Sequence, residues 1–406
     1  MNETERFLAP TEWYSDTDLL LADTVARWAE RELVLQRAER GEDFAELLAP
    51  ALRSLCIEIG VQRLFWPDDE KAVPRPADHA MSVAAVLEQV GRADVGLGCL
   101  LCDSFALQAL AIAAAGDHAA RRQELATQFE RAQEPAIVGL ILPDYATSGD
   151  HVDLDGLTCQ AEAVFERDRW IIRGRGARST GAGADASLFG VVARTTQGPA
   201  LFLVPAESGV SRGETILKTG LAASRNADLD IEATLAKSAM IGAGAEAVRG
   251  LCSWRLAGLA AVCLGAGRAA WRIVKDWSET RVIKGKGQIF KENPLVASAL
   301  GDIGAALGVG RPLACWSARM LARPDLYGDP GSPAVSTAVT AAARQVARDI
   351  MGAINRALEL MGSAGYATEW QIERYWRDIK MLETTLGPSA SAQVALARHY
   401  FDLQTL

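Results

Sequence analysis

The hydrophobic pattern of this chain changes twice, near Pro135 and near Gly242, and these two changes constrain its fold more than any single motif. Apolar residues recur at helical spacing before Pro135 and again after Gly242. Between these points, short alternating runs separated by polar turns predict strands. The pattern therefore predicts three parts, a helical N-terminal domain over residues 1–135, a middle β domain over 136–242 and a helical bundle over 243–406.

The C-terminal part contains three helical patterns. They run over Leu251–Arg281, Pro294–Leu307 and Ser336–Leu360. About six short strands in the middle part predict a small antiparallel barrel or sandwich. An antiparallel hairpin is expected within residues 160–173, where a polar turn separates two strand patterns. The expected fold class is mainly α with a central β domain.

The charge balance excludes two classes of partner. The chain has 406 residues and a formal net charge of -9, whereas nucleic acids and anionic membranes both require a basic face. We see no apolar run long enough to span a bilayer, and the acidic, polar N-terminus lacks a signal-peptide core. These features predict a globular protein with neither nucleic-acid binding nor membrane insertion.

The cysteines and histidines indicate no metal or disulfide framework. Seven cysteines, an odd and scattered set, favour a reducing compartment and predict a cytoplasmic protein. Cys99 and Cys102 form a C-x-x-C pair in an apolar helical stretch without a second pair, which favours buried packing over zinc binding. The four histidines have no metal-ligand spacing.

In the C-terminal 45 or so residues, helices alternate with breaks of small residues. A helix stops at a break of small residues, a charged helix follows, a second break comes at Gly387, and a last helix closes the chain. This pattern resembles the C-terminal domain of the acyl-CoA dehydrogenase family, and the order of helices, strands and helices extends the resemblance over nearly the full length. The positions in register are Gly362, Gly365, Tyr366, Glu373, Arg374, Arg377, Asp378, Gly387, Ala397 and Arg398.

The resemblance implies a three-domain fold with a C-terminal four-helix bundle, and FAD as the cofactor. In the middle part, the loop at 141–150 is similar to a family loop that touches the flavin, which makes Thr147 and Ser148 candidate contacts. The stretch from Trp170 to Asp185 is similar to the next family signature and adds Ser179 and Thr180. Arg178 replaces an aromatic residue that shields the flavin in the family. Arg178 beside a flavin would stabilise negative charge, and a pair with a local carboxylate is the alternative.

Other candidate cofactor residues resemble segments that complete the flavin site of a neighbouring subunit. They are Arg281, Glu292, Gly362 and Gly365, and Gly387 is a further candidate cofactor residue. Two lysines and an arginine within six residues at 281–286 suit a pyrophosphate, although a solvated basic loop would look the same. The resemblance therefore implies a homodimer or homotetramer.

Both positions that carry the catalytic base in the family hold apolar residues here, Leu386 and Trp254. An apolar side chain cannot accept a proton, so the usual base for α,β-dehydrogenation is missing. Candidate catalytic residues are Glu383, one turn before Leu386, together with Arg255 and Arg178. Glu279 is a further candidate for a relocated base.

Three hypotheses of function remain open. The first is a dehydrogenase of acyl-CoA thioesters with a relocated base, passing electrons to an acceptor such as an electron-transfer flavoprotein. The second is a flavoenzyme that needs no α-base, such as a desulfinase-like lyase or a flavin monooxygenase. The third is a subunit without a base that binds cofactor or supports a catalytic partner from the same family in a heteromer.

Overall fold

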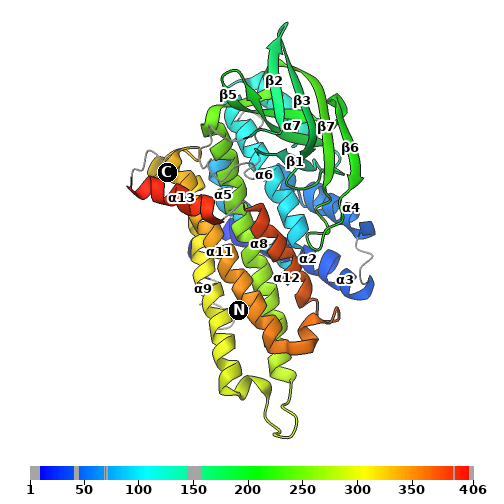
Figure 1. Ribbon diagram of the computed structural model, residues 1–406, viewed down its shortest axis with the longest axis vertical. Helices are drawn as coiled ribbons and strands as arrows, with labels where there is room; N and C mark the ends of the chain where they lie inside the picture. Colours follow the sequence, from blue (N-terminus) through cyan, green and yellow to red (C-terminus); the bar gives the residue numbers. More distant parts are fainter. Residues whose placement is uncertain are drawn as a thin grey trace.

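The computed structural model describes residues 10–40, 45–67, 69, 72–143, 158–386 and 389–401. The molecule is elongated, with a β-sheet at one end of its long axis and a helical bundle extending to the other (Figure 1). The N-terminal helices pack beside the junction of the two. The predicted fold class, mainly α with a central β domain, is confirmed.

The N-terminal part consists of helices, as the sequence predicts. Two short π-helical segments, Glu30–Val34 (η1) and Ser54–Glu58 (η2), continue longer helices. The helices are α2 (Asp16–Ala29), α3 (Leu35–Arg40), α4 (Ala45–Arg53), α5 (Ala80–Ala93), α6 (Val95–Ala115) and α7 (Ala119–Gln128), with 3₁₀ turns η3 (Val61–Arg63) and η4 (Pro76–His79).

Helix α6 lies between the sheet and the bundle and is buried on almost every side. It contacts strands of the sheet on one side and the long helix α8 (Gly244–Thr280) on another. Its N-cap is Asp94, whose carboxylate accepts a hydrogen bond from the Leu97 backbone N–H at 2.7 Å. The side chains of α6 therefore lie where the three parts of the chain meet.

One expectation from the sequence is wrong: two helices are long and apolar enough, by length and composition, to cross a membrane. These are α6 and α8, and most of the relevant stretch of each, 94% and 83%, is buried inside the protein. Their apolar residues form the protein's own core, which accounts for their composition without a bilayer.

The middle part is an eight-stranded sheet with the order β6-β7-β3-β2-β4-β5-β8, and β1 pairs with β4 beside this path. The strands are β1 (Val138–Ile141), β2 (Ala161–Glu166), β3 (Arg169–Arg178), β4 (Leu188–Thr195), β5 (Gly198–Pro205), β6 (Val210–Thr215), β7 (Ala227–Ala236) and β8 (Met240–Ala243). The expected hairpin is confirmed, since β2 and β3 pair antiparallel from Ala161↔Gly174 to Glu166↔Arg169. Its two turn residues both have positive φ, as a type I′ turn requires.

The expected purely antiparallel sheet of about six strands needs correction. The β1–β4 and β2–β4 pairings are parallel, so the sheet is mixed. The sequence pattern also missed β6 and β8. β6 is an exposed, polar edge strand, and β8 has only four residues, so neither produces a clear hydrophobic alternation.

The C-terminal part is a bundle built on α8, α9, α11 and α12. Helix α9 is longer than predicted, because it continues past Leu307 and through Pro312 to Ala322. The remaining elements are α9 (Pro294–Ala322), α10 (Pro324–Tyr327), α11 (Pro333–Met361), α12 (Ile372–Thr385) and α13 (Ser389–Phe401), with η8 (Phe290–Glu292) and η9 (Gly362–Tyr366).

Helices α5 and α8 cross with their backbones in direct contact. A Cβ atom at Gly265 of α8 would overlap the Glu88 carbonyl oxygen of α5 and lie 2.7 Å from the Arg92 nitrogen. A Cβ atom at Gly91 of α5 would likewise overlap the backbone of Val262. Only glycine permits this approach, which fixes how α8 sits on the N-terminal part.

Candidate functional site

A buried ion pair joins the three parts of the chain at the centre of the molecule. The Nε atom of Arg255 on α8 donates to Asp103 on α6 at 2.7 Å, and these side chains are 4% and 1% exposed. The hydroxyl of Thr180, just after β3, donates to the other carboxylate oxygen of Asp103. Burial opposes the charged guanidinium, but the charge of Asp103 outweighs it and raises the pKa of Arg255.

The same arginine reaches the end of α12. Its Nη1 atom lies 3.5 Å from the Thr385 carbonyl oxygen, one residue before Leu386. The structure therefore brings three predicted features together around Asp103: Thr180, Arg255 and the segment carrying Leu386. We call Asp103, Thr180, Arg255 and Thr385 the inner cluster.

Trp254, the other apolar residue at a base position, belongs to an aromatic group. Its ring lies 5.7 Å from that of Phe65 in an edge-to-face arrangement, and Phe65 makes a similar contact with Phe105 at 5.7 Å. Trp254 is buried, so packing explains its presence. This position supplies no group that can accept a proton.

Leu386 and the candidate base Glu383 face a second location, outside the inner cluster. Both line a cavity of about 290 Å³ between α11 and α12, which we call the α11–α12 cavity. Lys380 donates to the Glu383 carboxylate at 3.0 Å, and Arg344 donates to the Leu386 carbonyl oxygen at 2.6 Å. Helix α12 runs unbroken to Thr385, so it lacks the unwinding that would bring Glu383 to the position of Leu386.

The candidate Glu279 lies near the end of α8, where Lys275 and Lys291 pair with it at 4.0 and 3.3 Å. It lies on the helix end that points away from the sheet (Figure 1). An exposed carboxylate that pairs with two lysines is explained as a surface charge. The structure does not bring it to the inner cluster.

Among the candidate flavin contacts, Ser179 and Thr180 follow β3 beside the inner cluster. Ser179 is 4% exposed, and its hydroxyl has no hydrogen-bond partner among the residues that the structure describes. Arg178 instead points outward, where its Nε atom donates to Asp228 at 2.7 Å with 66% of its side chain exposed. This geometry matches the local carboxylate pair rather than a charge facing a flavin.

The remaining candidates lie at the far end of the molecule. The segment between α8 and α9, which carries Arg281 and Glu292, forms the tip of the bundle away from the sheet (Figure 1). Arg281 lies over the Trp277 ring at 5.7 Å and is exposed. Gly362 and Gly365 form the turn between α11 and α12, where Gly362 has φ +58°. Within a single chain, these residues therefore lie apart from Ser179 and Thr180.

Three candidates, Thr147, Ser148 and Gly387, lie outside the described residues. The structure adds one residue that the sequence did not single out, Asp103. It lies one position after Cys102, in a stretch that reads as apolar packing. A carboxylate in the middle of such a helix was the available signal, because a buried charge requires a partner.

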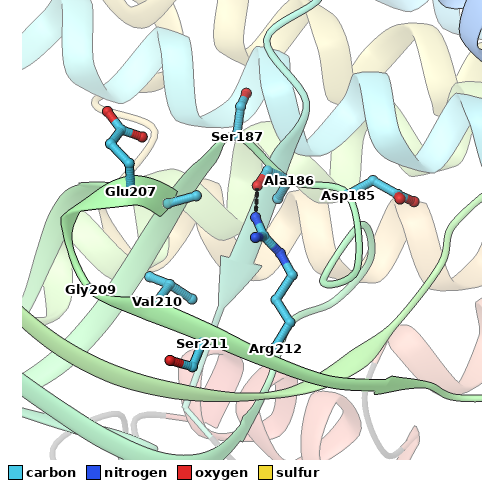
Figure 2. Close-up of a pocket in the computed structure, with 9 residues that line it drawn as sticks. Asp185, Ala186, Ser187, Glu207, Gly209, Val210, Ser211 and Arg212 are labelled. Atoms are coloured by element: carbon cyan, nitrogen blue, oxygen red, sulfur yellow. Dashed lines mark hydrogen bonds between the residues drawn. The ribbon is translucent and has the colours of Figure 1, made fainter.

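A further cavity, of about 530 Å³, opens on the β domain near Asp185 and Arg212 (Figure 2). Arg212 is held by backbone groups: it donates to the carbonyl oxygens of Gly183 and Ala186. Asp185 pairs with Arg225 at 2.9 Å. Since these charged groups already have partners in the fold, we interpret this cavity as structural.

In comparisons with known proteins, the matching family model and the similar proteins all point to acyl-CoA dehydrogenases. Residues 257–386 match the family model described as acyl-CoA dehydrogenase, C-terminal domain. The mitochondrial short-chain specific acyl-CoA dehydrogenase of Mus musculus is 26% identical over 396 residues, covering 95% of this chain and 90% of the relative.

Solved structures show the same fold. Butyryl-CoA dehydrogenase from Megasphaera elsdenii superposes with a TM-score of 0.78 at 16% identity, covering 96% of this chain and 99% of that one. Glutaryl-CoA dehydrogenase from Mycobacterium smegmatis in complex with FADH2 gives a TM-score of 0.76 at 18% identity, with 98% and 97% covered. At this level of identity, the superpositions establish the architecture.

Proposed function

The chain belongs to the acyl-CoA dehydrogenase family of flavoprotein oxidoreductases, and from this premise we propose that it binds FAD and acts on an acyl-CoA thioester without a free carboxylate base. The observation that carries the proposal is the inner cluster. In it, Thr180 and Arg255 both donate to Asp103 and Arg255 reaches the end of α12, while the two base positions hold Trp254 and Leu386.

The residues beside the inner cluster fit a flavin. The buried Ser179 hydroxyl has no partner among the described residues, and a buried polar atom of this kind needs one. Ser179 and Thr180 would hold the ring, while Arg281, Glu292, Gly362 and Gly365 would hold the dinucleotide in a second copy of the chain. FAD supplies the redox chemistry by accepting a hydride.

The chain's own residues would bind and orient the thioester and exclude water, but they offer little help in removing its α-proton. Asp103 is the one carboxylate in the inner cluster, and both its oxygens already accept hydrogen bonds. Glu383 pairs with Lys380 in the α11–α12 cavity. General-base assistance is worth about 10²–10⁴-fold in rate, so we expect slow dehydrogenation of simple saturated acyl-CoA esters.

The absence of a free base in the described part of the site also supports a second candidate function. The chain would then be a base-less subunit of a heteromer, or a flavoenzyme whose reaction needs no α-proton removal, such as a desulfinase-like lyase or flavin monooxygenase. The homodimer or homotetramer, the cytoplasmic location and an electron-transfer flavoprotein as acceptor remain parts of the proposal. The seven cysteines, none of which forms a disulfide in the structure, support a reducing compartment.

The test is to purify the chain alone, record its flavin spectrum and add a panel of acyl-CoA esters anaerobically. We expect bound FAD and slow bleaching by saturated esters. A flavoprotein that binds acyl-CoA without bleaching would favour the second candidate function. Purified protein that neither contains nor binds flavin would refute the proposal.

A further inference from the structure

The loop between β6 and β7, residues 216–226, is held against α12 by hydrogen bonds to its backbone. Asp378 on α12 accepts from the Leu221 backbone N–H at 2.6 Å. One residue earlier on the same helix, Arg377 donates to the Thr219 carbonyl oxygen at 2.7 Å. The loop therefore has a defined backbone position where it passes α12.

Lys218 of this loop is a partly exposed lysine without a counter-charge. Its Nζ atom donates to the Ser224 carbonyl oxygen and, at 2.7 Å, to the side-chain oxygen of Asn226. Both acceptors are neutral, and among the described residues no carboxylate lies within salt-bridge distance of Lys218. Lys275 and Lys380, by contrast, each pair with a glutamate.

An ammonium group in such a place loses its proton more easily than one in water. Burial lowers the pKa of Lys218 to about 8, and interactions with Cys99 on α6 and Asp378 on α12 raise it by less. In the neutral amine, two N–H groups satisfy both acceptors, which leaves the nitrogen lone pair free. A lysine amine in this state is a nucleophile.

We propose that Lys218 is a modification site, whose amine is acylated by an acyl thioester. The neutral Nζ atom attacks the thioester carbonyl carbon, a C–N amide bond forms, and the C–S bond breaks. The thiol leaves with the proton that the nitrogen gives up, so no oxidant or further reactant is needed. The identity of the acyl donor, acyl-CoA, rests on the proposed function, whereas the reactive amine does not.

Acylation of Lys218 would act on a candidate flavin contact through Asn226. The side chain of Asn226 accepts from Lys218 and donates to the Ser179 carbonyl oxygen at 2.8 Å. An acylated Nζ atom keeps a single N–H, so it cannot donate to both Ser224 and Asn226. We therefore expect the acylated protein to hold Asn226 less firmly and to bind FAD more weakly.

The experiment measures acetylation of each lysine in the full-length purified protein by mass spectrometry, with a small acetyl thioester that lacks coenzyme A. The internal control is Lys237, an exposed lysine directly after β7. At about pH 7.5 an ordinary lysine is almost entirely protonated, so we expect Lys218 to react about 10-fold faster or more. Its rate should level off above about pH 8, while the rate of Lys237 rises to about pH 10. If Lys218 reacts no faster than Lys237, the proposal is wrong.

Asn226→Asp tests the cause without removing the lysine. It places a carboxylate where the Nζ atom now meets a neutral amide oxygen, so the pKa of Lys218 should rise and its acetylation should slow about 10-fold or more. The matched control is Asn355→Asp on α11, an exposed asparagine outside the loop, which should leave the rate unchanged. If Asn226→Asp reacts as fast as the natural chain, the proposal is wrong. If that variant does not fold, the pH dependence of the natural chain decides.

FAD content separates this site from the proposed function. If the thioester acetylates Lys218 in a protein that neither contains nor binds flavin, the modification site holds and the proposed function fails. In a flavin-containing protein, acetylation should lower the FAD content of the natural chain but not that of Lys218→Arg, which lacks the amine. Equal loss of FAD from both proteins would overturn the link from Lys218 to Ser179.

Discussion

The Asp103–Arg255 pair is a buried ion pair whose loss should be costly. Asp103→Ala leaves a guanidinium that is 4% exposed without its counter-charge, and loss of one partner of a buried pair costs about 3–5 kcal/mol of unfolding free energy. Replacing both partners, as Asp103→Leu with Arg255→Met, should restore most of this stability because no charge remains buried. Urea unfolding of the three proteins measures the difference.

The exposed pair between Arg178 and Asp228 is the control. Arg178→Ala should cost less than about 1 kcal/mol, because water already screens that pair. If Asp103→Ala costs no more than Arg178→Ala, the inner cluster is hydrated in solution and Asp103 is available for other roles.

Leu386→Glu should create or sharply raise dehydrogenase activity. It restores a carboxylate at the position that carries the base in the family, and the expected gain in kcat is about 10²–10⁴-fold. The matched control is Leu386→Gln, which has nearly the same shape but cannot accept the proton. Flavin bleaching by a saturated acyl-CoA ester measures the rate.

A relocated base would give the opposite result. If the natural chain is already fast and Glu383→Gln abolishes its activity, then Glu383 is a relocated base and the site is not base-less. The structure argues against this, because Glu383 pairs with Lys380 and its helix is unbroken up to Thr385.

At the scale of elements, the crossing of α5 and α8 depends on glycine at position 265. Gly265→Ala places a methyl group onto the backbone of Glu88 and Arg92, which cannot move aside as a side chain end can. Overpacking of this kind costs about 1–3 kcal/mol or more. Thermal or urea unfolding measures the loss.

Gly352 of α11 is the matched control, because a Cβ atom there meets nothing within 4 Å and the residue is exposed. Gly352→Ala should stabilise the protein by about 0.5–1 kcal/mol, since alanine is the better helix former. If both substitutions stabilise equally, the two helices separate easily and their close approach does not fix the fold.

At the scale of the whole molecule, the predicted flavin residues divide between two separate regions, the centre of the molecule and the bundle end away from the sheet. Ser179 and Thr180 lie beside the sheet, whereas the segments carrying Arg281 and Gly362 lie toward the far end of the bundle (Figure 1). We therefore expect FAD to elute only with an oligomer in gel filtration. A stable monomer that keeps its FAD would contradict a site shared between chains.

Complementation in trans tests the same arrangement more sharply. Homo-oligomers of Arg281→Glu and of Thr180→Val should each bind FAD poorly. Mixed dimers of the two variants should recover one intact site, because one chain supplies Thr180 and the other supplies Arg281. Flavin content near half of the natural value in the mixed species is the expected outcome, and no recovery would show that each site uses one chain.

The sequence alone determined the order of helical and strand regions along the chain. Helical, strand and helical periodicities are local properties of the chain, so the helical and strand regions and the β2–β3 hairpin could be predicted from it. The two apolar residues Trp254 and Leu386 were equally visible, because side-chain chemistry at a given position does not depend on folding. The strands that the sequence missed, β6 and β8, are polar or short and have no such local signal.

Only the tertiary structure decided which residues share a location. Residues 103, 180 and 255 come from three separate parts of the chain, and their pairing around one carboxylate depends on how α6 lies between the sheet and α8. The same holds for the parallel strand pairs and for the α11–α12 cavity, where cations from two helices converge. Periodicity fixes which face of an element is buried, but long-range packing selects what that face meets.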